Sequence, residues 1–249
     1  MSQKKAIPVV NARRPLKAGG CLDVSVYNDS TGFGLYATDR RGTPVPDLAR
    51  YDCRTRAGLI QLLKQGLCLP LELAQDDSFI VRFRLGQADR QEAVEWTGRV
   101  VGRLHLPHGR VGCNGATVAV PPGDYLAEVC CYLPHSNAHY CLEWAQWVAE
   151  DDEPMESYWA RTRPGQDPPD WLDDSAESED KYVEFLVRLA APPKRLRLPA
   201  TGPDAGWPRY RDRTGYRGEH DRWWPLWSCR KPARCPLGIR AAGVVDAGL

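Results

Sequence analysis

Histidine and cysteine side chains in two short stretches of the chain could bind a metal ion. His105, His108 and Cys113 lie within nine positions, and residues 135–141 hold two more histidines and a cysteine. Neutral imidazole and thiolate are ligands that Zn²⁺ takes in tetrahedral protein sites. Neither stretch has the paired C-x-x-C elements of zinc fingers, and His105 shares the polar face of a predicted strand with two arginines. We therefore expect no bound metal. The alternative is a zinc-dependent enzyme whose metal ligands are His105, His108 and Cys113.

No set of acid, base and nucleophile is recognisable in the sequence. The chain lacks a G-x-S-x-G nucleophile elbow. Residues 98–102 contain two glycines, but they lie in a strand pattern, where glycine marks a bulge more often than a phosphate-binding loop. The carboxylates around Asp173 have no apolar sequence beside them that would divide acid and base roles. We expect a protein that is not an enzyme and needs no cofactor.

Charge is strongly segregated along a chain whose net charge is only +1. Residues 1–149 hold 17 Lys and Arg against 14 Asp and Glu, which gives a net charge of +3. Residues 150–191 hold 4 against 13, net −9, and residues 192–249 hold 12 against 5, net +7. A partner molecule would therefore meet an acidic block followed by a basic tail.

The acidic block is densest between Asp170 and Asp180, where six carboxylates occupy eleven positions. Clustered carboxylates are attracted to surfaces rich in Lys and Arg, and a neighbouring tryptophan is typical of the residues that anchor protein interfaces. The alternatives are a solvated loop or a counter-charge for the basic tail. We predict that this stretch binds another protein through Asp170, Trp171, Asp173, Asp174, Glu177, Glu179 and Asp180.

The basic tail interleaves arginines with aromatic residues, which could contact phosphates and stack on bases. This composition gives the alternative of an accessory protein that binds nucleic acid or another polyanion. The tail could equally fold back on the chain's own acidic block. The candidate nucleic-acid-binding residues are Arg209, Arg211, Arg213, Arg217, Trp223 and Trp224.

Alternation of apolar and polar residues predicts the strands that must position these groups. The pattern is typical of antiparallel sheet with one polar face. The predicted strands cover 22–27, 33–37, 79–85, 94–106, 125–133, 140–148 and 182–189. At least seven strands separated by turns predict a mainly β protein, an antiparallel β-sandwich. Its core is expected to bury Phe83, Trp96 and Val129 in one cluster.

One short helix is predicted between Thr55, which can cap its first turn, and Gly66, which can adopt the left-handed closing conformation. We divide the chain into a flexible basic arm, a β-sandwich domain with an acidic loop insertion, and an irregular basic tail rich in Arg, Trp and Pro. These parts cover residues 1–20, 21–191 with the insertion at 150–180, and 192–249.

The nine cysteines and the apolar runs bear on the cellular compartment. The longest apolar runs are only four or five residues, against about 20 for a membrane-spanning helix, and no apolar core follows the first charged residues. Most cysteines sit inside apolar alternation, as small buried hydrophobic residues do. We expect free thiols, no membrane span and a cytoplasmic protein.

Three segments between Asp77 and Pro134 carry a resemblance to a known family. They are the strand pattern 78–85, the strand ending in Leu-His-Leu-Pro at 104–107, and residues 118–125 with the sequence Val-Ala-Val-Pro-Pro-Gly-Asp-Tyr. These segments resemble the competence protein J family, small β-sandwich inhibitors of a DNA-uptake nuclease. The present chain is nearly twice the expected size, and its helix, acidic block and tail have no counterpart there. The resemblance implies a β-sandwich and a non-enzymatic protein-binding role, as an inhibitor or immunity-type protein whose partner is a nuclease or toxin.

Overall fold

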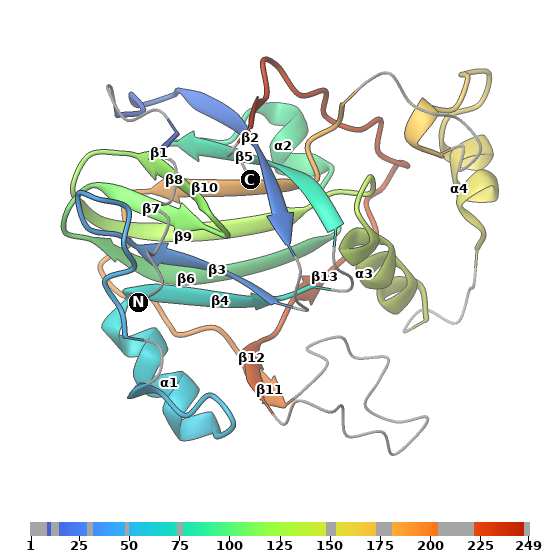
Figure 1. Ribbon diagram of the computed structural model, residues 1–249. Helices are drawn as coiled ribbons and strands as arrows, with labels where there is room; N and C mark the ends of the chain where they lie inside the picture. The colour runs from blue at the N-terminus through green and yellow to red at the C-terminus, as the bar shows by residue number, and fades with distance from the viewer. Residues whose placement is uncertain are drawn as a thin grey trace.

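The computed structural model shows two β-sheets packed face to face (Figure 1). It describes residues 9–10, 15–28, 32–47, 50–73, 77–147, 153–172, 181–203 and 222–246. The five-stranded sheet contains, in spatial order, β1 (Val9–Val10), β8 (Ala116–Ala119), β7 (Arg110–Cys113), β3 (Gly32–Ala37) and β4 (Cys68–Glu72). The seven-stranded sheet contains β13 (Ser228–Cys229), β6 (Gly98–Leu106), β9 (Gly123–Cys131), β10 (Phe185–Ala190), β5 (Asp77–Leu85), β2 (Cys21–Asn28) and β14 (Val245–Asp246). The predicted mainly β sandwich is confirmed.

Shorter elements surround the two sheets. A separate ribbon pairs β11 (Thr201–Pro203) with β12 (Trp223–Pro225). The helices are α1 (Arg56–Gln65), α2 (Arg90–Val94), α3 (Ser136–Trp147), α4 (Met155–Thr162) and the 3₁₀ turn η2 (Asp170–Leu172). Figure 1 shows α1 below β4, and α3 and α4 to the right of the sheets. No helix in the described ranges combines the length and apolar character that crossing a membrane requires.

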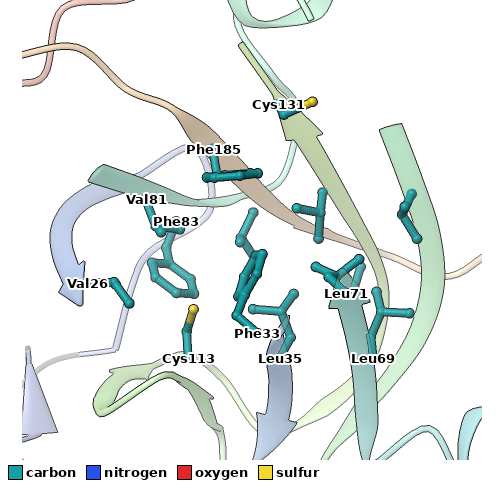
Figure 2. Close-up of a cluster of buried hydrophobic side chains, with 14 of the residues drawn as sticks. Val26, Phe33, Leu35, Leu69, Leu71, Val81, Phe83, Cys113, Cys131 and Phe185 are labelled. Carbon is teal, nitrogen blue, oxygen red and sulfur yellow. The ribbon is translucent and has the colours of Figure 1, made fainter. Parts of the chain in front are cut away.

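The core lies between the two sheets because their inward-facing residues are apolar at every second position. Phe33 of β3 packs against Phe79 of β5 and Phe185 of β10, with ring centroids 5.7 and 5.5 Å apart. Figure 2 shows these inward side chains, among them Phe33, Leu35 and Phe83, meeting between the sheets. Edge-to-face aromatic pairs of this kind add about 0.5–1.5 kcal/mol each beyond the area they bury.

The predicted helix is confirmed as α1, with both of its end signals in use. The Thr55 hydroxyl accepts a hydrogen bond from the Gly58 amide at 3.1 Å, and Gly66 closes the helix in the left-handed conformation at φ 64°. Leu59, Leu62 and Leu63 are buried, and α1 lies against β4 of the five-stranded sheet and β6 of the seven-stranded sheet. Local capping chemistry was therefore sufficient to place this element.

The predicted strand at 140–148 is wrong, because residues 140–147 belong to helix α3. Ala138, Cys141 and Leu142 are buried, and their spacing of three and four residues is the period of a helix. The Thr97 hydroxyl, on the chain leading into β6, donates a hydrogen bond to the Ala138 carbonyl at 3.1 Å. In the described ranges, α2, α3 and α4 thus accompany the sandwich in addition to the predicted helix.

The seven-stranded sheet differs from the prediction in direction and in exposure. Strand β10 lies antiparallel to β9 and parallel to β5. A strand inserted between two neighbours of opposite direction must be parallel to one of them. The outer face of this sheet, predicted to be polar and wet, is instead covered by α2 and the C-terminal stretch, with a second apolar cluster that includes Tyr132, Leu186 and Ile239.

Charged side chains on that covered face pair with one another. The Arg82 guanidinium donates to both carboxylate oxygens of Asp23, each at 2.7 Å, and also approaches Glu92 at 3.3 Å. Arg84 pairs with the same Glu92 carboxylate at 2.5 Å. Arg82, Asp23 and Glu92 are all buried. Their charges are compensated locally, as buried charges must be.

Trp96 lies outside the cluster in which it was predicted. Phe83 and Val129 are buried between the sheets, whereas Trp96 is half-buried beside the outer cluster. The predicted strand began four residues too early, because residues 90–94 form α2 and β6 begins only at Gly98. The Asp89-x-x-Glu92 capping box that starts α2 was the sequence signal for this helix.

Trp96→Ala is therefore expected to cost about 1–2 kcal/mol of unfolding free energy, less than Phe83→Ala. The indole stacks under the Arg230 guanidinium, whose central carbon lies 3.5 Å from the ring centroid, and this contact adds about 0.5–1 kcal/mol. Urea denaturation of both variants measures the difference. A loss from Trp96→Ala equal to or larger than that from Phe83→Ala would contradict this placement.

The basic tail is more regular than predicted. Strand β13 pairs with β6, β14 pairs with β2, and β12 pairs with β11. The acidic insertion likewise contains α4, whose Tyr158 hydroxyl donates to the Pro232 carbonyl of the tail. Long-range pairing of this kind leaves no local periodicity in the sequence, so the tail resembled an irregular segment.

Candidate functional site

The residues on both sides of the acidic stretch 170–180 are anchored to the tail. On its N-terminal side, the indole N–H of half-buried Trp171 donates to the Leu237 carbonyl at 2.9 Å. On its C-terminal side, Tyr182 pairs with Arg240, and the Val183 amide donates to the Ile239 carbonyl at 2.8 Å. Both flanks therefore rest on the same short stretch of the tail, residues 237–241.

Gly238 is the residue that allows the two flanks to meet. Its backbone is left-handed at φ 84°, and a Cβ placed there would lie 2.5 Å from Trp171 Nε1 and 2.9 Å from Tyr182 Cδ1. The stretch is itself fixed to α2, since the Gly238 amide donates to Glu95 at 3.1 Å and its carbonyl accepts from Gln91 at 2.9 Å. We call Trp171, Tyr182 and Gly238 the flank clamp.

The structure places only part of the predicted protein-binding set. Asp170 is exposed and Trp171 belongs to the flank clamp. The indole N–H of Trp171 thus makes a hydrogen bond within the chain, and this bond holds the N-terminal side of the acidic stretch against the tail. The remaining predicted residues lie outside the described residues: Asp173, Asp174, Glu177, Glu179 and Asp180.

One acidic residue of the insertion does pair with the basic tail. Glu153 receives Lys231 at 2.7 Å and Arg161 at 2.8 Å. Hydrogen bonds from Arg161 first, and then from Lys231, lower the pKa of Glu153 to about 2. The tail thus contributes a counter-charge at the start of the acidic block, whereas the densest carboxylates lie farther along the chain.

The alternative zinc ligands are distributed over two sheets. His105 is on β6, and its Nδ1 lies 3.0 Å from Asp124 Oδ1 on β9. His108 is exposed in the following turn, and Cys113 is buried on β7 of the other sheet, where burial raises the pKa of its thiol. Within the described ranges, no three His, Cys, Asp or Glu side chains gather in a metal-binding group.

The candidate nucleic-acid-binding residues of the tail are also only partly described. Arg209, Arg211, Arg213 and Arg217 lie outside the described residues, whereas Trp223 and Trp224 form β12. These two tryptophans line a cavity of about 420 Å³ over the outer face of β3 and β4. The sequence analysis missed this cavity, although alternation in β3 puts Gly32, Gly34 and Tyr36 on one face, a sign of a hollowed sheet surface.

The structure defines a two-sheet β-sandwich with a clamped acidic insertion in the connection between β9 and β10. Comparisons with protein-family models and with curated proteins found no match.

Among solved structures, the chain is similar to one titled "Crocagin biosynthetic gene J", at 18% identity and a TM-score of 0.42. It is also similar to ComJ from Bacillus subtilis, an inhibitor of the DNA degrading activity of NucA, at 11% identity and a TM-score of 0.36. Each match covers 72% of this chain and 100% of the other. The resemblance to the competence protein J family is therefore confirmed as a resemblance, and at these values it carries no argument about activity.

Proposed function

We propose that this chain is a non-enzymatic binding protein that recognises a basic surface of another protein through residues 170–180. The observation that carries the proposal is the flank clamp, which holds both sides of the most acidic stretch on residues 237–241. Five carboxylates are thereby tethered between two fixed points of a rigid sandwich. Tethering lowers the ordering entropy that a partner would otherwise have to offset on binding.

A nuclease or toxin with a cleft rich in Lys and Arg is the partner class that fits this charge. Such a cleft attracts phosphates, and it attracts clustered carboxylates for the same electrostatic reason. A protein that occupies the cleft would exclude nucleic acid, so the expected activity is inhibition of the partner. We also propose that the chain acts in the cytoplasm.

The test compares two variants with the same change in net charge. The segment variant carries Asp173→Asn, Asp174→Asn, Glu177→Gln and Glu179→Gln. The control variant carries Asp47→Asn, Glu143→Gln, Glu156→Gln and Asp167→Asn, four exposed positions elsewhere.

The partner is captured from host lysate with the unaltered chain and identified by mass spectrometry, and its affinity for each variant is measured. We expect the segment variant to bind at least about 10-fold more weakly, and the control variant to bind as the unaltered chain does. If the partner is a nuclease, DNA cleavage should be inhibited by the control variant and not by the segment variant. Equal affinity of the two variants would contradict the proposal.

A further inference from the structure

We propose that the cavity between β12, α1 and the outer face of β3 and β4 binds a small planar aromatic anion. Its volume of about 420 Å³ lies in the range of about 300–1,000 Å³ that small-molecule sites occupy. The site is independent of residues 170–180, so its test does not depend on the function proposed above.

The floor of the cavity is formed where the sheet lacks side chains. Gly34 lies on the outer face of β3, and the atoms nearest to a Cβ there would be Cys68 Sγ at 3.7 Å and backbone atoms of β4 at 3.9 Å, which is ordinary contact. Trp224 packs over Gly32, where a Cβ would lie 2.6 Å from the indole ring. Two glycines at alternate positions therefore leave a flat floor and let an indole close one end of it.

Aromatic side chains from three separate segments form the walls. Tyr36 comes from β3, Tyr51 from the loop before α1, and Trp223 and Trp224 from β12, and all four are half-buried. The Trp223 amide donates to the Cys53 carbonyl at 2.7 Å, which joins β12 to that loop by a backbone hydrogen bond. Partly exposed ring faces held in this way are suited to stack on a planar ligand.

The charged groups of the cavity favour an anion. Arg54 and Arg222 line it and are exposed, and Asp52 is the one carboxylate among its described lining residues. The Asp52 carboxylate accepts a hydrogen bond from the Arg54 backbone amide at 3.1 Å, so it stabilises the loop to which it belongs. Guanidinium groups bind phosphate and carboxylate through two parallel N–H donors.

Two thiols and one phenol of the lining stay neutral. Burial raises the pKa of the Cys53 thiol and that of the Cys68 thiol, the latter to about 12. Burial likewise raises the pKa of the Tyr36 hydroxyl, which keeps its proton as a hydrogen-bond donor. An anionic group near the two arginines would therefore meet no thiolate or phenolate.

The test is calorimetric titration of the full chain with four probes. 5′-AMP presents an aromatic ring with a phosphate, and indole-3-acetate presents one with a carboxylate; adenosine and inorganic phosphate each lack one feature. We expect one or both aromatic anions to bind at least about 10-fold more tightly than adenosine and phosphate. Only these two probes can stack on the aromatic walls and pair with the arginines at the same time. The probe that binds more tightly indicates which of the two anionic groups, phosphate or carboxylate, the site favours.

Three variants locate the binding. Gly34→Val fills the floor at a position whose backbone accepts a side chain, and Arg54→Gln with Arg222→Gln removes the cations. Both should lose at least about 10-fold in affinity, whereas Arg90→Gln, an exposed arginine on α2, should bind normally. Thermal melts confirm that each variant is folded. Binding of adenosine as tight as that of 5′-AMP, binding unchanged in folded Gly34→Val, or no heat from either aromatic anion at about 5 mM would each overturn the proposal.

Discussion

Asp23→Asn is expected to lower the free energy of unfolding by about 3–5 kcal/mol, because it removes one partner of a buried ion pair. Asp23 accepts both Arg82 hydrogen bonds at 2.7 Å and the Ala242 amide at 2.8 Å. Its hydrogen bonds first, and then its charge, raise the pKa of the Arg82 guanidinium, which therefore stays ionised. In the variant, Arg82 keeps its hydrogen bond to the Arg240 carbonyl at 3.0 Å, but its carboxylate partner is then Glu92, which Arg84 already contacts at 2.5 Å.

The matched control is Asp47→Asn, which breaks the Asp47–Arg50 pair at 3.0 Å with both side chains exposed. Exposed pairs contribute only about 0.2–1 kcal/mol, so this variant should unfold nearly as the unaltered chain does. Denaturant unfolding of both variants measures the contrast. A loss below about 1 kcal/mol for Asp23→Asn would mean that the pair is not buried in solution.

The stability of the chain is expected to fall on acidification because of His135. The imidazole is 1% exposed and packs between Phe79 and Phe185, with ring centroids 5.6 and 4.5 Å away. Burial first, and then the charge of His139, lowers the pKa of His135 from 6.5 to about 3. Above pH 6.5 the ring is neutral in both folded and unfolded chains, so it contributes no pH dependence there.

Below pH 6.5 the unfolded chain takes up a proton at this position and the folded chain does not, so stability falls until pH reaches about 3. At pH 4.5 the expected loss from this group is roughly 2–3 kcal/mol. The measurement is the unfolding free energy of the unaltered chain and of His135→Gln at pH 7 and pH 4.5. Between pH 7 and pH 4.5, His135→Gln should lose less unfolding free energy than the unaltered chain, by the amount that this imidazole contributes. His108→Gln, at an exposed position, should lose as much as the unaltered chain. Equal decreases in all three proteins would contradict the placement of His135.

What could be predicted from the sequence depended on how local its cause was. Helix α1 was found because Thr55 and Gly66 carry their own end signals. The core strands were found because alternation depends on nearest neighbours, as in Val81 and Phe83 of β5. Helix α3 was missed because its apolar residues also alternate well enough to resemble a strand, although the spacing of Ala138, Cys141 and Leu142 fits a helix and Thr97 packs against it.

The parts of the site that were missed depend on distant contacts. Gly238 meets Trp171 and Tyr182 only in the folded chain, so the flank clamp has no sequence pattern. Trp223 and Trp224 were recognised as stacking residues, but their position over Gly32 and Gly34 follows from the pairing of β12 with β11 and from its hydrogen bond to Cys53. The sequence therefore showed that these tryptophans can stack on a ligand, but their position in the molecule depends on the tertiary structure.

The central claim is that the tethered carboxylates of residues 170–180 direct the chain to a basic partner surface, and association kinetics test it most directly. The association rate constant with the captured partner is measured across a salt series for the unaltered chain, the segment variant and the control variant. At low salt the segment variant should associate at least about 10-fold more slowly than the other two, and the difference should close as salt screens the charges. Identical rate constants and identical salt dependence for all three proteins would contradict the claim.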